Sequence, residues 1–179
     1  MTDRRAIIFH GTGGHPDHCW YRWLGARLEA RGYEVELPHY PGLNSEPIET
    51  FLPIVLAGHE FEPGTVLVGH SGGAALLLAI LEHIEAPVAQ AILVAGYSTR
   101  PNQNEEPVLQ ASYDWERIKA NVRDISFINS VHDPYGCDAE QGRRMFDQVG
   151  GTQIIRDAGH FGDIDDPCPT FELLDKLID

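Results

Sequence analysis

The chain has 179 residues, of which 42% are hydrophobic and 9% aromatic, and we expect one globular domain over residues 1–179. Its formal charge of −14 and pI near 4.9 exclude a protein that binds nucleic acid through a basic surface, because phosphates would be repelled. The three cysteines, Cys19, Cys137 and Cys168, are widely spaced and odd in number, which argues against a disulfide framework or a structural zinc site.

The N-terminal segment MTDRRAIIFHG has two arginines but only four apolar residues, AIIF, before His10, too few for the apolar region of an export signal. No stretch of the chain approaches the roughly 18 apolar residues that a membrane-spanning helix needs. We therefore expect a cytoplasmic protein that does not contact a membrane, and the widely spaced cysteines are typical of such a reducing compartment.

Short β-branched runs alternate with helix-like segments along the chain. The expected strands are residues 4–11, 33–40, 65–70, 91–97, 124–131 and 152–158. The expected helices are residues 19–32, closed by Gly32, a weaker segment 48–60 broken by Pro53, 73–86 stopped by Pro87, 139–151 and 169–179. Residues 98–113 are polar, contain two prolines and predict a surface loop. Apolar strands that alternate with helices predict an α/β fold, a parallel sheet with helices on both faces.

The motif Gly69-His70-Ser71-Gly72-Gly73 has the spacing G-x-S-x-G and joins an expected strand to an expected helix. A strand that turns sharply into a helix leaves no room for a Cβ atom at Gly69 and Gly73, and it holds the serine in a strained conformation. The helix that follows is apolar on every side, so we expect it to be buried with its N-terminus directed at Ser71. The alternative is a glycine-rich turn with an incidental serine.

A serine hydroxyl is a weak nucleophile and needs a base, which in turn needs an orienting acid. After such a turn the acid is expected before the histidine in the chain. Asp133 follows the apolar run ISFINSV, and His160 follows the last expected strand, so both would lie at the same sheet edge as Ser71. His132 is an alternative base, and Asp157 and Asp163 are alternative acids. Structural roles are expected for His39, His59, His70 and His83.

The loop HGTGGHPDHC, residues 10–19, follows the first expected strand. Its glycines allow the backbone to approach an oxyanion closely, and we expect the backbone N–H groups of Thr12 and Gly72 to form an oxyanion hole. A dinucleotide-binding loop is excluded because Pro16 occupies the last glycine position, and the G-K-[ST] of a phosphate-binding loop is absent. A metal site is the remaining alternative for this loop, and its ligands would be His10, His15, His18 and Cys19.

Together these motifs resemble the α/β-hydrolase fold and, within it, the small retinoblastoma-binding serine hydrolase (YdeN-like) family. The resemblance covers nearly the whole chain and rests on IIFHGTGG with WYRWL, VELPHYPG, VLVGHSGGA, DWERIKAN and DAGHFG. It implies Ser71 as nucleophile, Asp133 as acid and His160 as base. It also implies a six-stranded sheet of order 2-1-3-4-5-6 without a lid domain. Some members bind a pocket protein through L-x-C-x-E, but residues 56–60 here are LAGHE and lack the cysteine.

We therefore expect a carboxylesterase-like serine hydrolase that cleaves a small-molecule carboxyl ester or amide through an acyl-enzyme intermediate, without a cofactor or metal. The expected pocket is shallow and open. Its candidate substrate-binding residues are His15, Trp20, Tyr97 and Tyr135, for which packing is an equally good explanation. Two alternatives remain, a non-catalytic protein-interaction module on the hydrolase fold and metal-assisted hydrolysis through the 10–19 loop.

Overall fold

The computed structural model describes residues 4–179. Residues 1–3, at the start of the segment considered as an export signal, lie outside the described residues. Strands and helices alternate along the chain as β1 (Arg5–Phe9), α1 (Tyr21–Glu29), β2 (Glu34–Glu36), α2 (Ile48–Gly58), β3 (Thr65–His70), α3 (Gly72–His83), β4 (Val88–Val94), α4 (Trp115–Ala120), β5 (Val122–Ser130), α5 (Ala139–Val149), β6 (Thr152–Arg156) and α6 (Glu172–Leu177).

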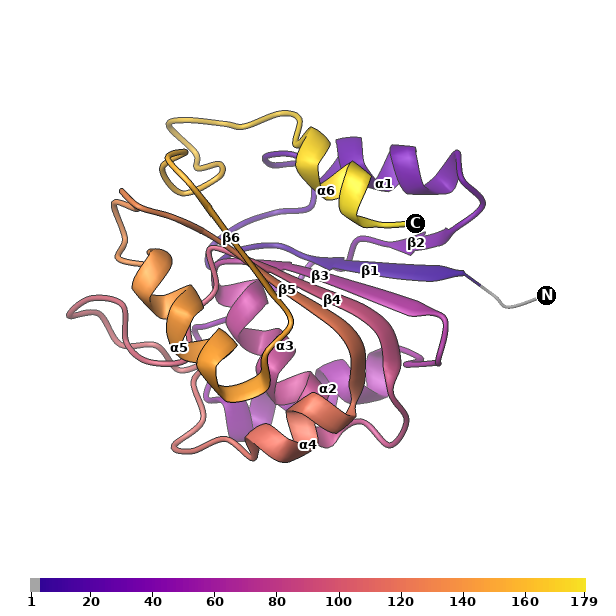
Figure 1. Cartoon of the computed structure of the whole chain (residues 1–179), viewed down its shortest axis with the longest axis horizontal. Helices are drawn as coiled ribbons and strands as arrows, with labels where there is room; N and C mark the ends of the chain where they lie inside the picture. Colours follow the sequence, from indigo (N-terminus) through magenta and orange to yellow (C-terminus); the bar gives the residue numbers. More distant parts are fainter. Residues whose placement is uncertain (1–3) are drawn as a thin grey trace.

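The six strands form one parallel sheet in the order β2-β1-β3-β4-β5-β6, which confirms the predicted architecture and strand order. Helices α1 and α6 cover one face of the sheet, and α2, α3, α4 and α5 cover the other (Figure 1). No lid domain interrupts residues 4–179, and residues 98–113 form an irregular loop as expected. This is the lid-free, three-layer arrangement that the resemblance to α/β hydrolases implied.

Helix α3 is the most deeply buried helix of the domain. Every residue from Gly72 to Leu81 is buried, as its uniformly apolar sequence predicts. It packs against β3 and β4 at the centre of the sheet, and α2 and α4 contact its other sides. Because apolar groups surround the helix, its N-terminus is held rigidly at the carboxyl edge of the sheet.

The prediction that Pro53 breaks the second helix is wrong. Helix α2 continues through Pro53 from Ile48 to Gly58. A proline removes the hydrogen bond to the carbonyl four residues earlier, here that of Glu49. Both residues are exposed, so water can bond that carbonyl, while Phe51, Leu52 and Val55 anchor the opposite side of the helix in the core.

The other differences are at the ends of predicted elements, together with one short helix that was not predicted. The second strand is much shorter than expected because it lies at the sheet edge and Pro38, which has no N–H, follows closely. Strand β4 begins at Val88, three residues earlier than predicted, and β5 begins two residues earlier, at Val122. The short helix α4 was not predicted, and Asp114 caps it by accepting a hydrogen bond from the Arg117 N–H at 3.0 Å. Within residues 4–179 no helix is long and apolar enough to cross a bilayer.

The close backbone approach between β1 and the start of α3 leads to a stability prediction. A Cβ atom at Gly73 would lie 2.6 Å from the Phe9 carbonyl oxygen, so β1 and α3 would have to move apart. We expect Gly73→Ala to lower the free energy of unfolding by about 3 kcal/mol, measured by urea denaturation.

The matched control is Gly25→Ala in α1. There the nearest atom to an added Cβ is a side-chain methyl of Leu37 at 3.3 Å, which can shift, and alanine favours the helix. We expect that variant to stay within about 1 kcal/mol of the wild type. Equal losses in the two variants would contradict the steric explanation.

Candidate active site

Ser71 occupies the turn between β3 and α3. Its backbone has φ 56° and ψ −119°, a region that residues with a side chain rarely adopt. A Cβ at Gly69 would lie 2.5 Å from the Gly73 carbonyl oxygen, so only glycine allows the strand to fold back this tightly on the helix. The Ser71 N–H donates to the Val94 carbonyl at 2.8 Å, which ties the turn to the end of β4. The serine side chain is thereby presented at the carboxyl edge of the sheet.

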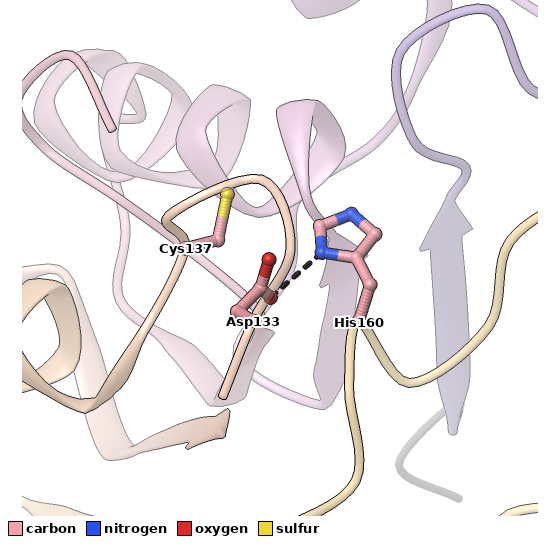
Figure 2. A group of neighbouring side chains, drawn as sticks. All are labelled: Asp133, Cys137 and His160. Carbon is pink, nitrogen blue, oxygen red and sulfur yellow. Dashed lines mark hydrogen bonds and ion pairs between the residues drawn. The ribbon is translucent and has the colours of Figure 1, made fainter. Parts of the chain in front are cut away.

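Asp133 and His160 come together from the loops after β5 and β6. His160 Nδ1 donates to Asp133 Oδ2 at 2.7 Å, with 9% of the histidine side chain and none of the aspartate side chain exposed (Figure 2). The Tyr135 backbone N–H donates to the other carboxylate oxygen at 2.8 Å. Because Nδ1 carries the proton in this arrangement, Nε2 of the neutral ring is free to accept one.

The alternative bases and acids lie elsewhere or have other partners. The His132 side chain is 81% exposed, and its Nδ1 pairs with the exposed Asp157 at 3.1 Å. Asp163 accepts a hydrogen bond from the Tyr135 hydroxyl. The structure therefore pairs His160 with Asp133 rather than with either alternative carboxylate.

Thr12 and Gly72 approach each other beside Ser71. A Cβ at Gly72 would lie 3.3 Å from the Thr12 backbone nitrogen. Neither of their N–H groups donates to an acceptor within residues 4–179. The Thr12 hydroxyl accepts from Asn44 Nδ2 at 3.0 Å, and the same amide donates to Glu106 at 2.5 Å. Thr12 is thus linked to the loop of residues 98–113, a connection that the sequence did not reveal.

A cavity of about 370 Å³ opens over Ser71 and His160. Its volume lies at the small end of the range for ligand pockets, about 300–1,000 Å³. The 98–113 loop forms part of its wall. Two of the expected substrate-binding residues, Tyr97 and Tyr135, line it, and the Tyr135 ring packs edge-on against His160 with 4.6 Å between centroids.

The other two expected substrate-binding residues do not line the cavity. Trp20 is fully buried, and its indole N–H donates to the Phe161 carbonyl at 2.9 Å, so it packs under the loop that carries His160. His15 lies outside the cavity wall, where its ring packs against His39 with 4.4 Å between centroids. The sequence could not distinguish a packing aromatic from a binding one at these loop positions.

Among the described residues, the donor atoms of His10, His15, His18 and Cys19, proposed for a metal site, do not converge on one point. His10 donates from Nδ1 to the Gly11 carbonyl at 2.7 Å and accepts from the Tyr40 N–H at Nε2, so both ring nitrogens are occupied. In residues 4–179 one group has metal-ligand chemistry: Asp133, Cys137 and His160, with donor atoms within 4.8 Å of one another (Figure 2). Two of these three already bond each other, and burial raises the pKa of the Cys137 thiol, which keeps it protonated.

His70, the variable residue of the serine motif, makes contacts that the motif does not predict. Its Nδ1 accepts from the Tyr21 hydroxyl at 2.6 Å, and its Nε2 donates to the His160 carbonyl at 2.7 Å. Burial, and then the neighbouring His160 ring, lower the pKa of His70 to about 3. The ring is therefore neutral near pH 7 and has one donor and one acceptor nitrogen, both used.

The chain is similar in sequence and in structure to known hydrolases. The family model described as serine hydrolase matches residues 6–167. Serine hydrolase RBBP9 of Rattus norvegicus is 28% identical over 165 residues, covering 88% of this chain and 87% of that protein. The crystal structure of the ydeN gene product from B. subtilis superposes with a TM-score of 0.88 at 23% identity, covering 97% and 96% of the two chains. The Arabidopsis methylesterase MES16 has a TM-score of 0.63 at 13% identity, covering 97% and 96%.

The buried neutral state of His70 predicts how stability changes with pH. In the unfolded chain this histidine has a pKa near 6.5, so protons bind the unfolded state more readily and stability is lost as pH falls from 6.5 toward 3. From about pH 7 to about pH 5 that loss is about 2 kcal/mol. His70→Gln lacks this titrating group, so the difference in unfolding free energy between wild type and variant should narrow by this amount from about pH 7 to about pH 5, measured by urea denaturation. Parallel pH curves for the two proteins would contradict a neutral His70.

Proposed function

Because this chain belongs to the serine hydrolase family, we propose that it cleaves a small carboxyl ester or amide through an acyl-enzyme intermediate. The observation that carries the proposal is the 2.7 Å hydrogen bond between His160 and Asp133, beside the strained Ser71 turn and at the same cavity. No cofactor or metal takes part in the proposed reaction.

In the proposed mechanism Ser71 Oγ attacks the substrate carbonyl while His160 Nε2 takes its proton. The same imidazolium then gives that proton to the leaving alcohol or amine, and the acyl group stays on Ser71. Water then attacks the acyl-enzyme carbonyl while His160 Nε2 takes its proton. That proton passes to Ser71 Oγ as the acid leaves, which restores the free serine. Asp133 stabilises the imidazolium, and its burial keeps water from weakening that interaction.

The oxyanion of each tetrahedral intermediate would be bound by the N–H groups of Thr12 and Gly72. Three features support this assignment: the two backbones are adjacent, both N–H groups lack a protein acceptor in the described residues, and Gly72 begins the buried helix α3. A donor at a helix N-terminus also benefits from the helix dipole. Loss of one such donor typically costs about 3 kcal/mol of transition-state stabilisation.

A carboxyl ester is the substrate class that we favour over an amide. A methylesterase of the same fold is a precedent for ester hydrolysis on this scaffold. The small cavity suits a short acyl group better than a long lipid chain. The chain therefore functions in this proposal as a carboxylesterase-like enzyme on small molecules.

A fluorophosphonate probe tests the proposal directly because it reacts with an activated serine. We expect the wild type to be labelled and Ser71→Ala not to be labelled, with the adduct located on the Ser71 peptide by mass spectrometry. Asp133→Asn should slow labelling by about 10³ to 10⁴-fold, since it allows the wrong tautomer of His160. Folded wild-type protein that is not labelled would favour the alternative, a protein-interaction module that retains the hydrolase fold.

The charge of the cavity predicts which acyl groups are preferred. Its lining includes Glu105, Glu106 and Asp163, and no lysine or arginine occurs among the described residues that line it. Glu105 pairs with Arg100 outside the lining, so the uncompensated charge is that of Glu106 and Asp163. An anionic acyl group would be repelled by at least about 1 kcal/mol. We expect p-nitrophenyl butyrate to have a kcat/KM at least about fivefold above that of p-nitrophenyl hemisuccinate, with Ser71→Ala as the blank.

Salt provides the control for the charge prediction. Higher ionic strength should narrow the difference between the two esters, because it screens exposed carboxylates. Equal rates at low salt would show that the carboxylates do not reach the acyl group.

A further inference from the structure

The loop that carries His160 has little regular backbone bonding of its own. It connects β6 to α6 over residues 157–171 and is irregular throughout. Its backbone bonds include Phe161 N–H to the Ala158 carbonyl at 3.2 Å and Asp163 N–H to the Asp166 carbonyl at 3.0 Å. These two bonds close short turns within the loop. At its start the loop is attached to the end of β5, where the Ala158 N–H donates to Ser130 Oγ at 3.0 Å. Its position at the active site therefore depends on contacts from other elements.

Two successive carbonyl groups of this loop accept hydrogen bonds from buried side chains of other elements. His70 Nε2 donates to the His160 carbonyl at 2.7 Å, and Trp20 Nε1 donates to the Phe161 carbonyl at 2.9 Å. His70 is 2% exposed and Trp20 is fully buried, so water does not compete for either bond. Phe161 has φ 57°, a conformation that its surroundings must maintain.

His70 also connects this loop to the loop after β1. The Tyr21 hydroxyl donates to His70 Nδ1 at 2.6 Å and accepts from the Gly11 N–H at 3.2 Å. Gly11 directly precedes Thr12, the residue assigned to the oxyanion hole. A continuous chain of hydrogen bonds therefore runs from Gly11 through Tyr21 and His70 to the backbone of His160.

We propose that His70 is a positioning residue, which together with Trp20 and Tyr21 sets the distance between the catalytic base and the oxyanion hole. This inference rests on the proposed function. His70 does not touch the reacting atoms; it acts through the backbone of His160 and through Tyr21. Its neighbour Ser71 belongs to the same turn. The segment of His70 and Ser71 therefore both presents the nucleophile and anchors the 157–171 loop that carries His160. A displacement of about 1 Å between reacting groups can lower the rate by about 100-fold.

The competing explanation is that His70 only fills volume in the core. Replacements that differ in their hydrogen-bonding groups distinguish this packing role from the positioning role. Glutamine places an amide N–H near the position of Nε2 and can keep the bond to the His160 carbonyl. Asparagine is too short for that bond, but its oxygen can still accept from Tyr21. Phenylalanine fills the volume and makes neither bond. If packing alone mattered, phenylalanine would be the best replacement.

The experiment compares these three variants in steady-state hydrolysis of p-nitrophenyl butyrate and in fluorophosphonate labelling. We expect kcat to fall about 10 to 100-fold in His70→Asn and His70→Phe, with KM changed less than about threefold. His70→Gln should stay within about fivefold of the wild type, and Tyr21→Phe should lose less than His70→Asn. Full activity in His70→Phe, or equal losses in the glutamine and asparagine variants, would overturn the proposal.

The control is His59→Asn. His59 is also a buried histidine, 5% exposed at the side chain, whose Nδ1 bonds Glu36 at 2.5 Å and whose Nε2 bonds Tyr40 at 2.8 Å. It makes no contact with the loop of residues 157–171 among its hydrogen bonds. We expect its substitution to lower stability without changing kcat, which separates loss of stability from loss of positioning.

A second measurement does not require activity. Amide hydrogen exchange of peptides spanning 157–168 should be at least about tenfold faster in His70→Asn than in wild type and near wild type in His70→Gln. If the wild type neither reacts with the probe nor turns over esters, the proposed function fails, and this exchange still tests the hydrogen bonds. Unchanged exchange in every variant would show that His70 does not hold the loop.

Discussion

The close contact between β1 and the start of α3 is the constraint on which the rest of the structure depends. Gly73 lies against the Phe9 carbonyl with no room for a side chain, and this approach gives Ser71 its left-handed backbone. The same contact brings the Gly72 N–H beside the Thr12 N–H. A larger distance between β1 and α3 would relax the strained Ser71 backbone and would also move the Thr12 and Gly72 N–H groups apart. The geometry of the turn and that of the oxyanion hole therefore cannot vary independently.

The parallel sheet gathers the other groups, but it does not orient them. Asp133, His160 and Thr12 reach one edge because parallel strands end on the same side. Their loops have few regular hydrogen bonds, so buried side chains do the orienting: Asn44 for Thr12, and His70 with Trp20 for the His160 loop. His70 and Trp20 are buried, so leaving either of their bonds to the loop unpaired would be costly.

Charge is distributed differently inside and around the site. Asp133 is a fully buried carboxylate paired with His160, while burial keeps His70 neutral despite its place next to the nucleophile. The cavity wall carries carboxylates, in keeping with a chain of net charge −14. A neutral His70 adds no positive charge beside His160, so the imidazolium that forms during the proposed reaction is stabilised by Asp133 without repulsion from its neighbour.

The sequence by itself determined the alternation of strands and helices, the burial of α3 and the glycine turn around Ser71, because short-range sterics and hydrophobic periodicity act within a few residues. The strand order was implied by the family resemblance, and the structure confirms it. Chain order also led to Asp133 and His160, which the structure brings within hydrogen-bond distance. Only the tertiary structure decided that Trp20 packs under the base loop, that both nitrogens of His70 have partners, and that α2 passes through Pro53. Each depends on which distant atoms or solvent surround a residue, and local pattern contains no information about them.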